Sequence, residues 1–70
     1  MFSVLTPREA EIARDLALGR TCREIARRLG ISVKTVDSHR NRLLKKLQTP
    51  NNVTLARLAL SQGFVTLNEV

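Results

Sequence analysis

The 70-residue sequence has few aromatic side chains: two phenylalanines, no tyrosine and no tryptophan. Proteins that hold single-stranded nucleic acid stack its bases on aromatic rings, so the sequence argues against most members of that class. It also has a single cysteine, Cys22, which cannot form an internal disulfide, and no cysteine and histidine spacing typical of zinc. We therefore expect no metal, no cofactor and a reducing compartment such as the cytoplasm.

Long apolar runs are absent as well. None approaches the roughly 18 residues that cross a bilayer, and no signal-peptide pattern opens the chain, so we expect no membrane partner. A chain this short buries only about 60% of its unfolded surface, which leaves room for one domain with one core. His39 has no second histidine, cysteine or carboxylate cluster placed to join it. We therefore expect no enzymatic activity.

Negative charge is scarce, with six acidic residues against twelve lysines and arginines and a net charge of +6. The excess is local: residues 1–19 carry a net −1, residues 20–46 carry +7, and residues 47–70 carry zero. A charge that only kept the protein in solution would not be confined to one segment. The distribution instead indicates one face that binds a polyanion.

The pattern of caps and breaks predicts an all-α fold of four helices. Thr6 with Glu9 and Thr21 with Glu24 each form the spacing of a capping box, and Gly30 ends the second helix. Only about three residues then separate the second helix from the third, which is the signature of a helix-turn-helix. The expected helices cover about residues 7–18, 22–29, 33–47 and 53–62.

The third helix has two faces at 3.6 residues per turn. The inward stripe is apolar and consists of Val33, Val36, Leu43, Leu44 and Leu47. The opposite face is polar or basic and consists of Lys34, Ser38, Arg42 and Lys45. Arg40 falls inside the apolar stripe, and a buried guanidinium needs a partner, so we expect it to be half-buried and paired with Glu9 or Glu24.

The fourth helix has more apolar residues than one core-facing stripe requires. If Val53, Ala56 and Leu60 face the core, a narrow outward seam remains. Its members are Thr54, Leu58 and Ser61. Two copies of this seam would be self-complementary about a two-fold axis, so we expect a weak homodimer that forms together with binding of the polyanion. Residues 66–70 are expected to fray.

Several segments, in this order and spacing, carry a resemblance to a known family. They are LTPREAEI at 5–12, EIARRLGIS at 24–32, KTVDSHR at 34–40, KKL at 45–47 and ALSQGFV at 59–65. The chain resembles the LuxR-type helix-turn-helix domain, also called NarL or GerE type, of bacterial transcription regulators. The resemblance implies that the third helix enters the major groove and the fourth pairs two subunits. It also implies that Asp37, Ser38 and Asn41 read bases, that the protein acts at the bacterial nucleoid, and that RNA polymerase is a further candidate partner.

Side-chain chemistry suggests a role for each polar residue of the third helix. Asn41 could pair with adenine, Asp37 could accept from cytosine, and Lys34 could donate to guanine. Asp37 could equally serve only to reduce repulsion within a basic face. Phosphate contacts are expected from residues near helix N-termini or on the flanks of the third helix. These residues are Thr21, Arg23, Thr35, Arg42, Lys45 and Lys46.

Two functions from different classes follow. The first is sequence-specific binding of double-stranded DNA in transcription regulation. The second is a helical adaptor for protein interaction that keeps the fold but does not bind DNA. The segment of +7 charge and the resemblance favour the first. Within DNA binding, the promoter-reading region of a sigma factor is similar, but the match through the fourth helix argues against it.

Overall fold

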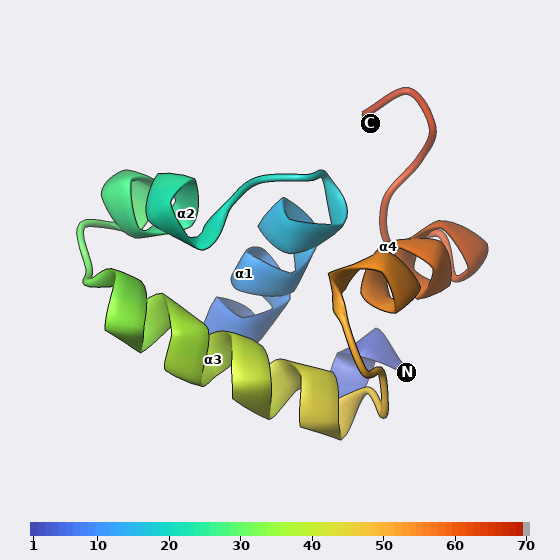
Figure 1. Cartoon of the computed structure of the whole chain (residues 1–70). Coiled ribbons are helices and arrows are strands. Elements are labelled where there is room, and N and C mark those ends of the chain that lie inside the picture. Colours follow the sequence, from blue (N-terminus) through green and yellow to red (C-terminus); the bar gives the residue numbers. More distant parts are fainter. Residues whose placement is uncertain (70) are drawn as a thin grey trace.

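The computed structural model describes residues 1–69, which form a short 3₁₀ helix and four α-helices without a strand. The elements are η1 (Phe2–Val4), α1 (Pro7–Ala17), α2 (Cys22–Leu29), α3 (Val33–Lys46) and α4 (Asn52–Ser61). Helix α1 lies in the middle and packs against the other three α-helices (Figure 1). Helix α2 also packs against α3. The predicted all-α fold is confirmed, with every predicted helix boundary within one residue of its observed position.

Both capping boxes form as the sequence predicted. The hydroxyl of Thr6 accepts from the Glu9 amide at 3.1 Å, and the Glu9 carboxylate accepts from the Thr6 amide at 2.9 Å. In α2 the same pair of bonds joins Thr21 and Glu24, at 3.1 and 2.8 Å. Each box satisfies two backbone donors that the first turn of a helix would otherwise leave without partners.

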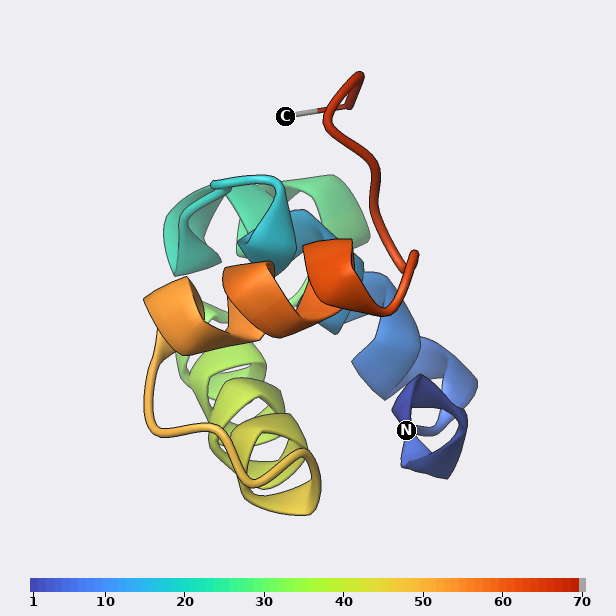
Figure 2. The same cartoon turned by 90° about the vertical axis from the view of Figure 1, so that its right-hand side faces the viewer.

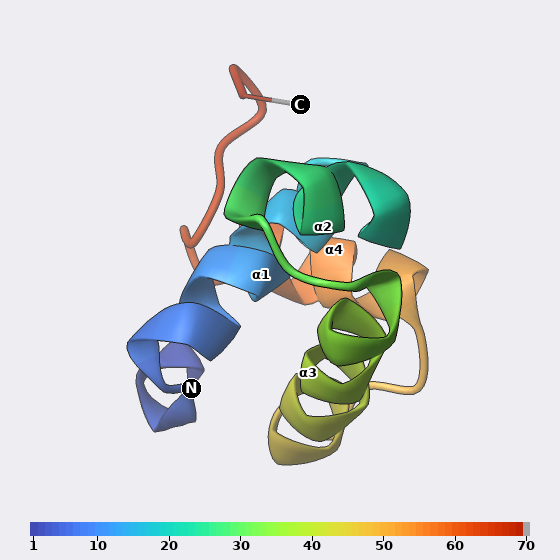
Figure 3. The ribbon, with the colours of Figure 1, turned by 90° about the vertical axis from the view of Figure 1, so that its left-hand side faces the viewer.

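The turn between α2 and α3 is short because Gly30 takes a left-handed conformation, with φ 68° and ψ 33°. A residue with a Cβ would pay about 1–2 kcal/mol in this region. Ser32 then caps α3 by accepting from the amide of Thr35 at 3.0 Å. Figure 3 shows this turn leaving the end of α2, passing beneath that helix and entering α3, which then runs away from α2. The predicted helix-turn-helix is confirmed.

The core fills the space that α1 shares with the other helices. Its largest fully buried apolar side chains come from all four α-helices and from the segment after α4: Ile12, Ile25, Val36, Leu43, Leu55 and Val65. Val65, with Ala17 of α1 and Ala59 of α4, forms a second small cluster. The chain after α4 therefore folds back onto the core.

Two details of the predicted core are wrong. Val33 is 47% exposed, because side chains on a helix lean toward its N-terminus and only the turn before α3 lies there. On α4, Val53 is 68% exposed, while Leu55 and Ala59 are buried. Leu58, which was expected to face outward, is half-buried against the main core. The helix is therefore rotated from the face that was predicted.

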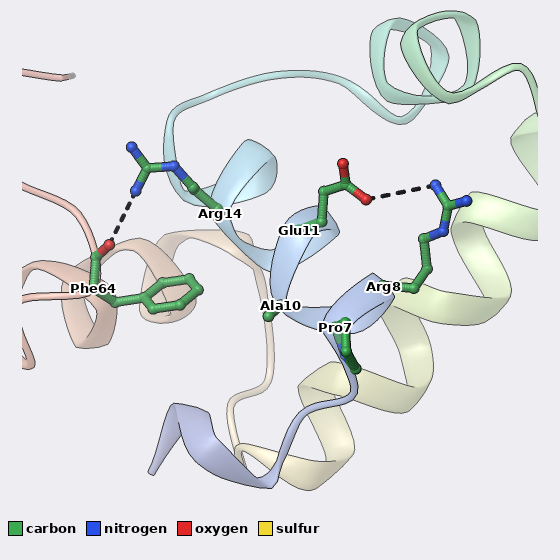
Figure 4. Close-up of a pocket in the computed structure, with 6 residues that line it drawn as sticks. All are labelled: Pro7, Arg8, Ala10, Glu11, Arg14 and Phe64. Carbon is green, nitrogen blue, oxygen red and sulfur yellow. Dashed lines mark hydrogen bonds and ion pairs between the residues drawn. The ribbon is translucent and has the colours of Figure 1, made fainter.

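The segment after α4 is tied to α1 (Figure 2). Arg14 donates to the carbonyl oxygen of Phe64 at 3.1 Å (Figure 4). The same guanidinium forms an ion pair with Glu69. The ring of Phe64 stacks on that of Phe2, with the centroids 4.1 Å apart. Residues 66–69 form a turn in which the Glu69 amide donates to the Thr66 carbonyl oxygen at 3.1 Å. The predicted fraying of residues 66–70 stays a prediction, and Val70 lies outside the described residues.

None of the helices within residues 1–69 combines the length and the apolar character needed to cross a membrane.

Candidate nucleic-acid interface

The outer face of α3 presents all four residues that were expected to read bases. Lys34, Asp37, Ser38 and Asn41 are exposed, and their spacing of three, four and seven residues places them on one side of the helix. The opposite side is buried through Val36 and its apolar neighbours. The 14 residues of α3 span about 21 Å, so four polar side chains share a rod long enough to lie along a DNA groove.

Ser38 already uses its hydroxyl proton inside the helix. Its Oγ donates to the carbonyl oxygen of Lys34 at 3.1 Å. Because a hydroxyl has one proton and two lone pairs, Ser38 in this state can only accept from an outside group. The exposed amino groups of cytosine and adenine in the major groove are donors of that kind.

Arg40 lies between α3 and α4 and is half-buried, as predicted. Its Nε donates to Oδ1 of Asn52 at 2.9 Å, and its Nη1 donates to Oδ1 of Asn41 at 3.4 Å. The predicted carboxylate partner is wrong, because Glu9 binds Lys46 and Glu24 closes the cap of α2. Carboxamide oxygens are sufficient here because the guanidinium keeps part of its contact with water.

Lys46 has a structural partner on α1. Its Nζ lies 2.7 Å from Oε1 of Glu9, whose side chain is 2% exposed. The pKa of Glu9 is held below its ordinary value, first by the hydrogen bond from Lys46 and then by the bond from the Thr6 amide. The charge of Lys46 is thus largely used to neutralise a buried carboxylate, so we expect it to add little to a phosphate contact.

A second group of ion pairs joins α1 to α2. Arg28 donates from Nε to Oδ2 of Asp15 at 2.8 Å and from Nη1 to Glu11 at 3.3 Å. Arg20 also approaches Asp15, at 3.5 Å. The hydrogen bond that Arg28 donates to Asp15 raises the pKa of Arg28 above its ordinary value. Asp15 is 7% exposed, so this carboxylate is a fixed part of the contact between the helices.

These pairs divide the nine basic side chains of residues 20–46 into two sets. Arg20, Arg28 and Lys46 bind carboxylates of α1. The other six have no carboxylate within 4.0 Å in the described part of the chain. They are Arg23, Arg27, Lys34, Arg40, Arg42 and Lys45. Sequence reasoning missed Arg27, although its spacing of four residues from Arg23 places both on one flank of α2.

The remaining residues expected to contact phosphate lie where the predictions placed them. Thr21 is the N-cap of α2 and Arg23 lies in its first turn, whereas Thr35 lies in the first turn of α3. Arg42 and Lys45 are exposed in the second half of α3. The first three side chains are therefore close to backbone amides that helix N-termini offer to anions.

The predicted outward seam on α4 does not form a continuous exposed stripe. Thr54 and Leu58 are half-buried, and only Ser61 is exposed. The apolar surface that α4 leaves accessible is instead Val53 with half-buried Ala56 and Leu60. These three side chains line an open hollow of about 620 Å³ together with the end of α1 and the residues around Cys22. We call this surface the α4 outer stripe.

Helices α2 and α3, with their tight turn and their outer basic surface, make this molecule a helix-turn-helix domain. The model of the family described as bacterial regulatory proteins, luxR family, matches residues 3–59. The chain therefore belongs to this family and is a helix-turn-helix DNA-binding domain of the LuxR type, which confirms the resemblance of its sequence.

Its relatives are longer bacterial proteins. The chain is 51% identical over 53 residues to the transcriptional regulatory protein UhpA of Escherichia coli (strain K12), a match that covers 76% of this chain and 27% of UhpA. It is 43% identical over 63 residues to the response regulatory protein YgeK of the same organism, covering 90% of this chain and 43% of YgeK. Identity to the transcriptional regulatory protein MctR of Rhizobium johnstonii is 44% over 62 residues, covering 89% of this chain and 29% of MctR. The chain spans less than half the length of each of these relatives.

Proposed function

We propose that this chain binds specific sequences of double-stranded DNA in transcription regulation at the bacterial nucleoid, with α3 in the major groove. One observation carries the proposal. The outer surface of α2 and α3 holds five exposed basic side chains without a carboxylate partner among the described residues, while the basic side chains directed at α1 are neutralised there. Because the major groove of B-DNA is about 12 Å wide, it admits a helix such as α3.

Reading and anchoring fall to different side chains in this proposal. Lys34, Asp37, Ser38 and Asn41 read base edges, since they are exposed together on one side of α3. Phosphates are bound on either side of the groove by Thr21, Arg23, Arg27, Thr35, Arg42 and Lys45. Lys46 is left out of this set because it is paired with Glu9. Phosphate contacts determine the affinity and its salt dependence, whereas base contacts determine the sequence preference.

Pairing of two copies through α4 completes the proposal. The α4 outer stripe supports it, because Val53 is a large apolar side chain left 68% exposed beside two partly exposed apolar neighbours. A two-fold contact between two such stripes would place two α3 helices on half-sites about one DNA turn apart. RNA polymerase remains a candidate partner of the DNA-bound dimer.

The test begins with selection of binding sites from random duplexes, followed by titration of the selected duplex at several salt concentrations. With four basic side chains on phosphates per chain, the logarithm of the binding constant should fall with a slope of about −3 to −4 per logarithm of salt. Lys45→Ala should reduce the steepness by about one unit on every duplex. Asn41→Ala should keep the slope and lower the preference for the selected duplex by about 5- to 100-fold.

Failure to bind any of the duplexes would instead support the alternative function, an adaptor for protein interaction with the same fold. Equal losses from Asn41→Ala on the selected and random duplexes would remove Asn41 from the readers.

A further inference from the structure

A chain of hydrogen bonds runs from the first turn of α4 to the outer face of α3. Asn52, the first residue of α4, accepts from Nε of Arg40 at 2.9 Å. Nη1 of the same guanidinium reaches Oδ1 of Asn41 at 3.4 Å. Arg40 therefore touches both a residue of the helix proposed to pair two copies and a residue proposed to read DNA.

The chemistry of the guanidinium determines how both asparagines are oriented. Because arginine has only donors, the oxygen of each carboxamide must face it. For Asn41 this directs Oδ1 toward Arg40 and leaves Nδ2 on the far side of the group. One lone pair of Oδ1 and both protons of Nδ2 stay available, which is the set that a bidentate contact with adenine uses.

An exposed asparagine that nothing holds would sample several rotamers. Asn41 is exposed, so the bond from Arg40 is its restraint within the described residues. A side chain already oriented for its partner loses less conformational freedom on binding. Arg40 in turn is held by Asn52, whose backbone is fixed in the first turn of a capped helix.

We propose that Arg40 is a positioning residue for base reading, anchored by Asn52 and holding the carboxamide of Asn41 in the orientation that meets a base edge. The proposal rests on the proposed function, because Asn41 must read a base for its orientation to matter. It makes the placement of α4 against α3 part of sequence recognition. A second copy that contacts Val53 would therefore touch the residue next to Asn52, which anchors Arg40.

The experiment compares four variants on the selected duplex and on duplexes changed at single base pairs. Asn41→Ala first identifies the base pair whose preference depends on Asn41. Asn52→Ala should lower the preference at that same base pair by about five-fold, the factor that loss of one hydrogen bond gives. Adding Asn52→Ala to Asn41→Ala should cause no further loss, because the two side chains act through one contact. Asn52→Asp keeps an acceptor for Arg40 and should retain the preference.

Arg40→Lys separates positioning from charge. Lysine keeps the positive charge, so the salt slope should stay unchanged. It lacks the rigid planar guanidinium with which arginine binds two carboxamides at once. The preference at the base pair read by Asn41 should fall as it does in Asn52→Ala. In the free protein, the side-chain amide NMR signals of Asn41 should shift in Asn52→Ala and in Arg40→Lys but not in Asn52→Asp.

Folding is a separate measurement. Asn51, not Asn52, caps α4, so thermal unfolding of Asn52→Ala should stay close to that of the parent protein. If Asn41→Ala alters no preference, Asn41 is not a reader and the proposed function is revised. The positioning role of Arg40 is overturned by a different result. In that result Asn41→Ala alters the base-pair preference, but Asn52→Ala changes neither that preference nor the side-chain amide NMR signals of Asn41. Equal weakening of all duplexes by Arg40→Lys would overturn it as well.

Discussion

Neighbouring residues of one helix can carry the same charge and do different work. Lys45 and Lys46 are adjacent and both lie outside the apolar stripe of α3. Lys46 reaches the buried carboxylate of Glu9 on α1, whereas Lys45 has no carboxylate within 4.0 Å among the described residues. The position of a lysine in the sequence therefore shows that it lies outside the core, but only the neighbouring helix decides its role.

This difference predicts opposite effects for two alanine substitutions. Lys46→Ala leaves the Glu9 carboxylate buried without its ammonium partner, so the free energy of unfolding should fall by about 1–2 kcal/mol, moderated by the partial exposure of Lys46. Lys45→Ala should alter the free energy of unfolding by less than about 0.5 kcal/mol. The salt slope of DNA binding should show the reverse order. Urea unfolding and duplex titration measure both; equal stability of the two variants would contradict the structural role of Lys46.

The lowered pKa of Glu9 predicts how stability depends on pH. In the folded state Lys46 and the Thr6 amide hold this pKa below the ordinary value of 4.5, so the folded protein binds fewer protons than the unfolded chain. The contribution of Glu9 is therefore complete above about pH 4.5 and is lost as pH falls through the lowered pKa. Glu24 acts in the same direction, because its bond with the Thr21 amide lowers its pKa.

Urea unfolding of the parent protein and of Glu9→Gln between pH 7 and pH 2 provides the check. Glutamine has no charge to lose, so Glu9→Gln should be less stable at pH 7 and should lose less stability on acidification. Parallel curves for the two proteins would show that Glu9 does not contribute to the acid sensitivity. Glu69→Gln provides a comparison, because it removes the charge of an exposed carboxylate that is paired with Arg14 of α1.

At the scale of the helix, local signals in the sequence predicted the elements well. Thr6 and Glu9 form a capping box, and Gly30 ends α2, because these interactions involve residues within one turn of each other. Such contacts depend only on the adjacent chain. They could therefore be read without knowing how the helices pack.

The face of α4 and the partner of Arg40 could not be read in this way. Six apolar side chains among ten positions allow more than one buried face, and contacts with α1 select Leu55 and Ala59. The partner of Arg40 is Asn52, a neutral side chain 12 residues away on another helix. Hydrophobic periodicity predicts neither the buried face of α4 nor the partner of Arg40, because both depend on how the helices pack. The exposure of the polar side chains of α3 was predictable, because its charge and its apolar stripe agree.

At the scale of the whole molecule, α1 packs against the other helices and also pairs with some of their basic residues. Its carboxylates, Glu9, Glu11 and Asp15, take three basic partners from α3, α2 and the loop before α2. The net charge of +7 on residues 20–46 therefore overstates the charge that can act on DNA. What remains is carried mainly by exposed side chains of α2 and α3, namely Arg23, Arg27, Lys34, Arg42 and Lys45.

The rotation of α4 changes how its role in pairing should be tested. The sequence alone suggested substitution of Leu58, but this side chain packs against the core, so Leu58→Asp should cost more than about 1 kcal/mol of stability and lose DNA binding of every kind. Val53 is the better site, because it is 68% exposed and lies in the first turn of α4. An aspartate there is favoured by the helix dipole, so stability should change by less than about 0.5 kcal/mol.

Val53→Asp places a negative charge on each of two stripes that meet about a two-fold axis, so the like charges should oppose pairing. Binding to a duplex with two half-sites should become about ten-fold weaker or more, and its cooperativity should disappear, while affinity for a single half-site stays within about two-fold of the parent. Val53→Thr, similar in shape but uncharged, serves as the matched control and should keep part of the cooperativity. Titration of both duplexes with the three proteins, together with urea unfolding, makes the comparison. Retained cooperativity in Val53→Asp would mean that two copies meet elsewhere or bind independently, and the α4 outer stripe would lose its proposed role.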